Sequence, residues 1–246
     1  MLRILLTITI AGVVGFFLYQ NNQKAQNYGA PPYVEGTGEQ SNFFEEDFSD
    51  WKRPEGPLRV GLQAGHWKTN EMPDEQEKLR ERGGGTSNGD VKEWHVNLRI
   101  AEETKKILEK EGLVVDILPS TIPPEYWADA FVAIHADGSE NPFKSGYKVA
   151  SPRRDYSGRS RDLASIIGDT YGNELGMEED PNITRNMTGY YAFASWRYEH
   201  AIHPMTPAAI LETGFLTSQS DSQILIHNPE KPARALANAL LAFLKS

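Results

Sequence analysis

The sequence predicts an α/β fold, in which a single domain with a mostly parallel central sheet flanked by helices follows an N-terminal hydrophobic helix and a linker. From residue 58 onward, short apolar runs typical of strands alternate with longer segments of helical period. Several of these runs, such as residues 130–134 and 208–211, are apolar throughout, which is typical of strands that a parallel sheet buries on both faces.

The first twenty residues predict a signal peptide or a membrane anchor. An apolar run covers residues 4–19 and follows Arg3. As a helix this run would be roughly 24 Å long, a little short of a hydrocarbon core. Because no convincing small-residue cleavage site follows it, we favour an anchor in the cytoplasmic membrane. Arg3 favours the cytoplasmic side, so the rest of the chain is expected to be extracytoplasmic, as a membrane-anchored envelope protein or a secreted one.

Residues 21–56 are predicted to form a flexible linker, and residues 57–246 a catalytic domain. The linker is rich in Gly, Asn and Pro and sustains neither a helical nor a strand period. In the domain the predicted strands cover residues 58–62, 113–118, 130–134, 147–150 and 208–211. The predicted helices cover residues 91–111, 163–174 and 233–244.

Composition excludes several classes of function. The chain of 246 residues contains no cysteine, which rules out disulfides, cysteine-ligated zinc and a cysteine nucleophile. Any metal must therefore be held by His, Asp or Glu. The formal net charge of -9 argues against a nucleic-acid partner, which usually needs a basic face.

Three predicted strands run into residues capable of metal binding or acid–base chemistry. His66 follows residues 58–62, His135 follows residues 130–134, and Glu212 follows residues 208–211. Ligands in open α/β sheets bind at the carboxyl ends of the strands, so parallel neighbours would direct these side chains into one crevice. A fourth candidate, Glu93, stands at the start of a predicted helix on that same side.

Two histidines and a carboxylate form a common catalytic zinc set with one open coordination position, and a second carboxylate can serve as general base. Each residue also has a simpler explanation. His66 or His135 alone is more often a hydrogen-bonded structural residue. Glu93 could interact only with the helix dipole, and Glu212 could be a turn residue.

In these residues, from about residue 58 to the C-terminus, the chain resembles the zinc-dependent N-acetylmuramoyl-L-alanine amidases (amidase type 3 catalytic domain). Four segments match in order: Gly65-His66, Glu93 at the start of a long helix, Ile134-His135-Ala136, and residues 211–217, LETGFLT. The resemblance implies one Zn²⁺ held by His66, Glu93 and His135, with Glu212 as general base. It also implies peptidoglycan as the substrate, cut between lactyl-muramic acid and L-alanine.

The chain departs from the family pattern at several positions. Gln63-Ala64 stand where Asp-Pro is usual, Asp137-Gly138 replace Asn-Ala, and Ser218 replaces Asn. A charged insert, residues 72–82, lengthens the connection between His66 and Glu93. These departures leave the implied ligand set intact but bear on the support of His66 and on substrate preference.

Four further residues are candidates for substrate binding. Arg185 and Asn186 could bind stem-peptide carboxylates through charge-assisted hydrogen bonds, or belong to a solvated loop. His200 and His203 precede the strand of Glu212 and could contact substrate or a second metal. An aromatic cluster, Tyr190, Tyr191, Phe193 and Trp196, is predicted to pack in the core, with a sugar platform as the alternative.

The sequence therefore predicts a peptidoglycan amidase. Two alternatives remain open: another zinc peptidase of the cell wall that acts on stem peptides, because fold does not determine substrate, and a non-catalytic wall-binding module.

Overall fold

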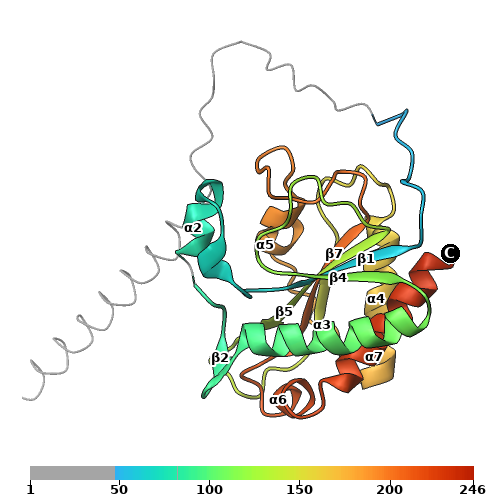
Figure 1. Ribbon diagram of the computed structural model, residues 1–246. Helices are drawn as coiled ribbons and strands as arrows, with labels where there is room; N and C mark the ends of the chain where they lie inside the picture. The colour runs from blue at the N-terminus through green and yellow to red at the C-terminus, as the bar shows by residue number, and fades with distance from the viewer. Residues whose placement is uncertain (1–47, 82) are drawn as a thin grey trace, which may run out of the picture. The chain divides into compact units, whose positions relative to one another are not determined.

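The computed structural model describes residues 48–81 and 83–246, and its centre is a five-stranded sheet (Figure 1). The strands follow the order β4-β1-β5-β7-β6. Their bounds are β1 Arg59–Ala64, β4 Val114–Leu118, β5 Ala130–Asp137, β6 Lys148–Ala150 and β7 Ala208–Phe215. The four strands β4, β1, β5 and β7 are parallel, and only the edge strand β6 pairs antiparallel, with β7. The predicted α/β class with a mostly parallel sheet is confirmed.

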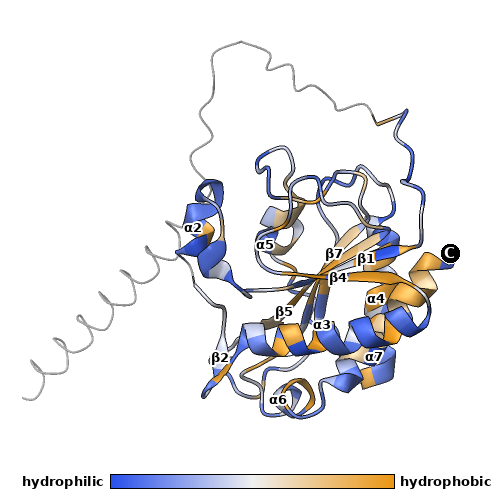
Figure 2. Ribbon diagram, in the orientation of Figure 1, coloured by the Kyte–Doolittle hydropathy of each residue, from blue (hydrophilic) through white to orange (hydrophobic). Residues whose placement is uncertain are grey.

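Three helices cover one face of the sheet. They are α3 (Glu93–Lys110), α4 (Ser160–Leu175) and α7 (Glu230–Leu244), and their apolar sides join alternate strand residues in one core. Val132 and Ile134 of β5 and Leu211 of β7 point into this core. Figure 2 shows the apolar strands at the centre and α3 with apolar and hydrophilic stripes, as expected of a helix that buries one side.

Loops and short helices cover the opposite face, where a second core cluster lies. The helices are α5 (Arg185–Thr188) and the 3₁₀ turn η3 (Tyr191–Phe193). Phe131 and Ala133 of β5 belong to this second cluster. Because strand side chains alternate between faces, the next residue in that series, His135, also emerges on this side. The same alternation places Glu212 two residues beyond Ile210 of β7 on this side.

The remaining elements are short. They are η1 (Thr69–Glu71), η2 (Asp74–Gln76), α2 (Glu77–Arg80), β2 (Ser87–Asn88), β3 (Val91–Lys92) and α6 (Asp221–Leu225). β2 and β3 pair as a small antiparallel hairpin directly before α3. The helix predicted from residue 91 therefore begins at Glu93, because the two preceding residues are extended and pair with β2.

Three central strands extend past their predicted ends. The prediction ended them at residues 62, 134 and 211, whereas β1 runs to Ala64, β5 to Asp137 and β7 to Phe215. His135 and Glu212 are register partners, so these polar residues lie within the paired strands and not after them. The register shifts between His135 and Asp137, an irregularity of the kind found next to active sites.

The segment just before β1 contacts the domain. Arg53 forms a bidentate ion pair with Asp129, with distances of 2.6 and 2.9 Å. Trp51 stacks on His203 with ring centroids 5.7 Å apart. Contacts group Phe48–Ser246 as one unit. Part of the predicted linker, residues 48–56, thus makes domain contacts, and the boundary at residue 57 stays a prediction.

The predicted N-terminal helix of residues 1–20, and residues 21–47 of the predicted linker, lie outside the described residues. Among residues 48–81 and 83–246, no helix is both long and apolar enough to cross a membrane.

Candidate active site

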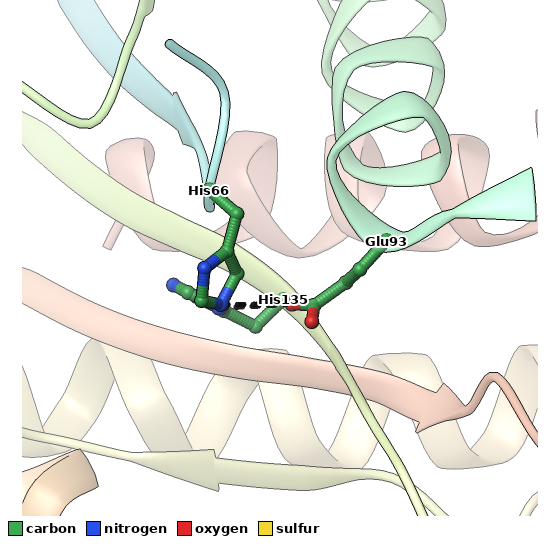
Figure 3. Close-up of side chains that lie close together, drawn as sticks. All are labelled: His66, Glu93 and His135. Atoms are coloured by element: carbon green, nitrogen blue, oxygen red, sulfur yellow. Dashed lines mark hydrogen bonds and ion pairs between the residues drawn. The ribbon is translucent and has the colours of Figure 1, made fainter. Parts of the chain in front are cut away.

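His66, Glu93 and His135 converge at the carboxyl ends of the central strands (Figure 3). One potential ligand atom from each residue lies within 4.8 Å of the other two. Glu93 Oε1 is 3.1 Å from His135 Nδ1 and 3.5 Å from His66 Nε2. Glu93 and His135 are buried, and His66 is half-buried. The fold thus brings together three residues that lie far apart in the sequence.

The turn after β1 directs His66 toward the other two residues. Gly65 N donates to Ile134 O at 2.9 Å, which continues the pairing with β5 by one residue. His66 then adopts a left-handed backbone conformation with φ of 63°, unusual for a non-glycine residue and typical of functional sites. Gly65 packs so closely on the His135 ring that any Cβ atom would overlap the ring. Glycine at this position lets the two histidines approach each other.

Glu93 is held by hydrogen bonds to both carboxylate oxygens. Oε2 accepts from Thr86 N at 2.8 Å, while Oε1 accepts from Asn97 Nδ2 and Ala136 N, each at 3.2 Å. Burial alone would raise the pKa of Glu93, but the hydrogen bond and charge of His135 and the charge of His66 lower it. The carboxylate is therefore ionised and has a defined orientation.

The hydrogen bonding of His66 fits a bound cation. His66 Nδ1 lies 3.1 Å from Gly83 O, and a carbonyl oxygen can only accept a hydrogen bond. In the neutral ring Nδ1 therefore carries the proton, and the bare Nε2 faces the carboxylate of Glu93. Burial lowers the pKa of His66, although the charge of Glu93 opposes this effect. Two acceptors that face each other inside a protein are stabilised by a cation between them.

Glu212 lies beside this cluster as the register partner of His135. It is the only residue of β7 that keeps partial exposure to solvent. Burial raises the pKa of Glu212 to about 7; the charges of His135 and Lys148 oppose this shift, and those of Glu93 and Asp137 add to it. A carboxyl group with this pKa can both accept and return a proton near neutral pH.

The sequence interpretation missed Lys148, a buried cation next to Glu212. Lys148 is the register partner of Glu212 on β6, and its side chain is 7% exposed. Its ammonium group pairs with Asp137 and lies 3.5 Å from Asp180 Oδ2. A lysine in an otherwise unremarkable short strand carries no local signal of this role, which depends on pairing with β7.

Arg185 and Asn186 form the exposed first turn of α5, which directly precedes Tyr190. Tyr190 in turn contacts the cluster of His66, Glu93 and His135, because its hydroxyl lies 2.9 Å from His135 Nε2. Tyr190 and Tyr191 pack against the second core cluster, as predicted for the aromatic residues, whereas Trp196 is 44% exposed.

His200 contacts the charged insert. Glu75 accepts hydrogen bonds from Glu199 N and from His200 N and Nδ1, all at 2.9 Å. Gln76 Nε2 donates to His200 O at 3.0 Å. His200 therefore ties the insert to the loop before β7. Substrate contact by Arg185, Asn186 and His200 stays a prediction.

His203 lies apart from the cluster of His66, Glu93 and His135. Its ring contacts Phe48 and Trp51, and its backbone N donates to Tyr126 O at 2.8 Å. His203 precedes β7, and Tyr126 precedes β5. Both therefore lie near the amino ends of the parallel strands, whereas His66 follows β1 at their carboxyl ends. The sequence suggested a groove position for His203 because it lies close to β7. In the structure His203 lies near the start of β7, not near its carboxyl end.

A cavity of about 500 Å³ opens beside His66. Aromatic, cationic and glycine residues line it, including Trp67, Lys68, Arg80, Gly83 and Trp94. The insert supplies part of the wall, so the long connection between His66 and Glu93 shapes the surroundings of the site.

The chain matches a known protein family in sequence and several solved structures in fold. A family model described as N-acetylmuramoyl-L-alanine amidase matches residues 60–242. No curated protein matches the chain in sequence.

Several solved structures share the fold. The amidase AmiC2 of Nostoc punctiforme is 20% identical with a TM-score of 0.56, over 78% of this chain and 100% of that one. Ami1 from Mycobacterium smegmatis is 17% identical with a TM-score of 0.55, over 76% and 97% of the two chains. The apo form of Ami1 from Mycobacterium abscessus is 21% identical with a TM-score of 0.54, over 76% and 98%.

At these identities the structural matches establish the fold, and the family assignment comes from the family model. That model spans all four residues of the site, from His66 to Glu212. The chain belongs to the N-acetylmuramoyl-L-alanine amidase family, the enzymes that hydrolyse the amide bond between muramic acid and L-alanine in peptidoglycan.

Proposed function

We propose that this amidase depends on zinc held by His66, Glu93 and His135, with Glu212 as its general base. The observation that carries the proposal is the convergence of one ligand atom from each of the three residues within 4.8 Å. The set contains only nitrogen and oxygen donors, in the two-histidine, one-carboxylate combination of catalytic zinc sites. Zinc at this position would lower the pKa of a water molecule and polarise the amide carbonyl.

The residues around the cluster would carry out the proton transfers. Glu212 takes the proton of the attacking water on a carboxylate oxygen and delivers it to the departing amine nitrogen of L-alanine. Its pKa of about 7 suits both steps. Lys148 lowers this pKa by its charge, which keeps part of the Glu212 population ionised at neutral pH.

Arg185, Asn186 and His200 would contact the stem peptide, as their residue types allow. The first two lie on α5, just before Tyr190 and the cluster, and His200 lies where the insert meets the loop before β7. We make no such proposal for His203, which packs against Trp51 near the amino ends of the parallel strands.

Peptidoglycan lies outside the cytoplasm, so the enzyme acts there. On the sequence pattern of residues 1–20 and 21–56, we propose a membrane anchor and a linker that carry the catalytic domain. Fractionation of the full-length chain, with sequencing of its amino terminus, tests this proposal. Recovery of a processed chain in the soluble fraction would show that residues 1–20 are a cleaved signal peptide and not an anchor.

Mass spectrometry of muropeptides tests the reaction itself. Digestion of peptidoglycan by the zinc-loaded enzyme should release free stem peptides that begin with L-alanine. A zinc peptidase that acts on stem peptides would instead shorten peptides that remain attached to the lactyl group, and a non-catalytic module would release nothing.

Metal analysis tests the ligand set. His135→Ala should lose zinc, because it removes a buried ligand. His227→Ala, an exposed histidine between α6 and α7, should keep it. Equal zinc content in the two variants would remove His135 from the ligand set.

A further inference from the structure

The second ring nitrogen of His135 contacts Tyr190, a residue with no part in the proposed proton transfers. His135 Nε2 lies 2.9 Å from the hydroxyl of Tyr190, and the two rings meet edge to face with centroids 5.3 Å apart. On the other side of the ring, Nδ1 faces Glu93 Oε1 at 3.1 Å. Which nitrogen carries the proton therefore decides whether His135 can act as a metal ligand through Nδ1.

Metal binding through Nδ1 determines the direction of that hydrogen bond. A ring nitrogen that binds a metal carries no proton, so the proton of the neutral His135 ring is then on Nε2. The oxygen of Tyr190, 2.9 Å away, accepts the hydrogen bond from Nε2–H. The neighbouring Tyr191 donates its own hydroxyl proton to Ser120 O at 2.6 Å.

We propose that Tyr190 is a positioning residue that holds His135 as the Nε2–H tautomer and thereby presents a bare Nδ1 to the metal. The inference rests on metal binding by the proposed cluster. It assigns to His135 the same arrangement that Gly83 O gives His66, in which one nitrogen donates to a protein acceptor and the other faces Glu93. Such outer partners orient ligating histidines and strengthen their binding to the metal.

Packing holds Tyr190 in the position that this role requires. Its ring contacts those of Tyr191 and Phe193, with centroids 4.5 and 5.5 Å away. Tyr191 is itself held from β1, because Gln63 Nε2 donates to its hydroxyl at 2.9 Å. The packing that supports Tyr190 thus begins on the central sheet, next to the strand that carries His135.

Zinc affinity of the full-length chain, measured by competition with a chelator, tests the proposal. Tyr190→Phe keeps the ring and removes the acceptor, so its zinc affinity should fall by about 10- to 100-fold. Tyr147→Phe is a control, because Tyr147 is a buried tyrosine away from the cluster that donates its hydroxyl proton to a backbone carbonyl, Gly168 O, at 2.8 Å. It should lower thermal stability to a similar extent and leave zinc affinity unchanged.

A spectroscopic readout separates positioning from general damage. Nitrogen NMR of the zinc-loaded chain should show His135 protonated at Nε2 and bound to the metal through Nδ1 in the wild type. In Tyr190→Phe the Nε2–H group loses its acceptor, so the Nε2 signal of His135 should shift. Tyr191→Phe leaves Tyr190 in place but removes the hydroxyl that anchors the neighbouring ring to Ser120 and Gln63, so its zinc affinity should lie between those of wild type and Tyr190→Phe.

The outcomes distinguish this proposal from the proposed function. If the wild type binds no zinc, the metal-dependent function fails. If the wild type binds zinc and Tyr190→Phe binds it equally tightly with an unchanged Nε2 signal of His135, only the role of Tyr190 is overturned.

Discussion

Glu212 and His135 are register partners across the β5–β7 pair, so their side chains emerge next to each other from one face of the sheet. This relationship places the proposed general base directly beside a proposed metal ligand, with both residues on paired strands. It also explains why the charges of both His135 and Glu93 act on the pKa of Glu212.

Glu212→Gln should abolish most turnover and keep the metal. The amide side chain has a similar shape but accepts no proton, so kcat should fall by about 10²- to 10⁴-fold. Zinc content should match that of the wild type, because Glu212 lies outside the ligand set. Glu230→Gln, at an exposed position in the first turn of α7, serves as the control with unchanged activity. Near-wild-type turnover of Glu212→Gln would refute the role of general base.

The pKa of Glu212 predicts a pH-dependent difference in stability in the metal-free protein. Burial raises this pKa from 4.5 to about 7, so the folded state favours the protonated carboxyl group. The contribution of Glu212 to stability is therefore fully present below pH 4.5 and is lost as the pH rises to about 7. Relative to the wild type, Glu212→Gln should gain about 1–3 kcal/mol between these limits. Urea unfolding at several pH values measures the difference, and a difference that does not depend on pH would contradict the raised pKa.

Two adjacent glycines should respond differently to the same substitution. A Cβ atom at Gly85 would overlap Glu93 Oε2 and lie 2.7 Å from His66 Cδ2, and the residue has φ of 75°. Gly85→Ala should therefore displace Glu93 and lower zinc affinity by at least about tenfold, as loss of ligand support does. A Cβ atom at Gly84 meets no atom within 4 Å, so Gly84→Ala should bind zinc normally. Equal zinc affinities in a chelator competition would show that close packing at Gly85 does not constrain the cluster.

Lys148 should contribute far more to stability than its neighbour Lys144. Both ammonium groups pair with Asp180, but the Lys148 side chain is 7% exposed and that of Lys144 is 38% exposed. Lys148→Met leaves the carboxylate of Asp137 and the buried one of Asp180 without their shared cation, which should cost about 3–5 kcal/mol. Lys144→Met removes a pair near the surface and should cost at most about 1 kcal/mol. Denaturant unfolding at neutral pH measures both losses, and similar values would argue against a buried charge network.

The pKa of Asp180 determines the pH below which its ion pairs with Lys148 and Lys144 stop stabilising the fold. Burial alone would raise its pKa, but hydrogen bonds from Asn182 and Lys144 and the charge of Lys148 lower it to about 2. A lowered pKa means that its stabilising contribution is present above the unfolded value of 3.8 and is lost as the pH falls toward 2. The difference between Lys148→Met and wild type should therefore shrink below pH 4.

The order of strands and helices along the chain, and the grouping of His66, Glu93 and His135, could be predicted from the sequence. Apolar runs and helical periods can be recognised in the sequence, because each reflects the burial of residues within one strand or helix. Sequence reasoning also grouped His66, His135 and Glu212, because parallel neighbouring strands end at the same edge of a sheet.

The groups that surround that cluster could not be predicted from the sequence, because they come from distant segments of the fold. Tyr190 reaches His135 across 55 residues of sequence, and Lys148 meets Glu212 through an antiparallel edge pairing that no local pattern predicts. The sequence placed His203 in the site because it precedes β7. In the structure it packs on Trp51 near the amino end of that strand, whereas the site lies at the carboxyl ends. Contacts between distant segments depend on packing and register, which a single element does not encode.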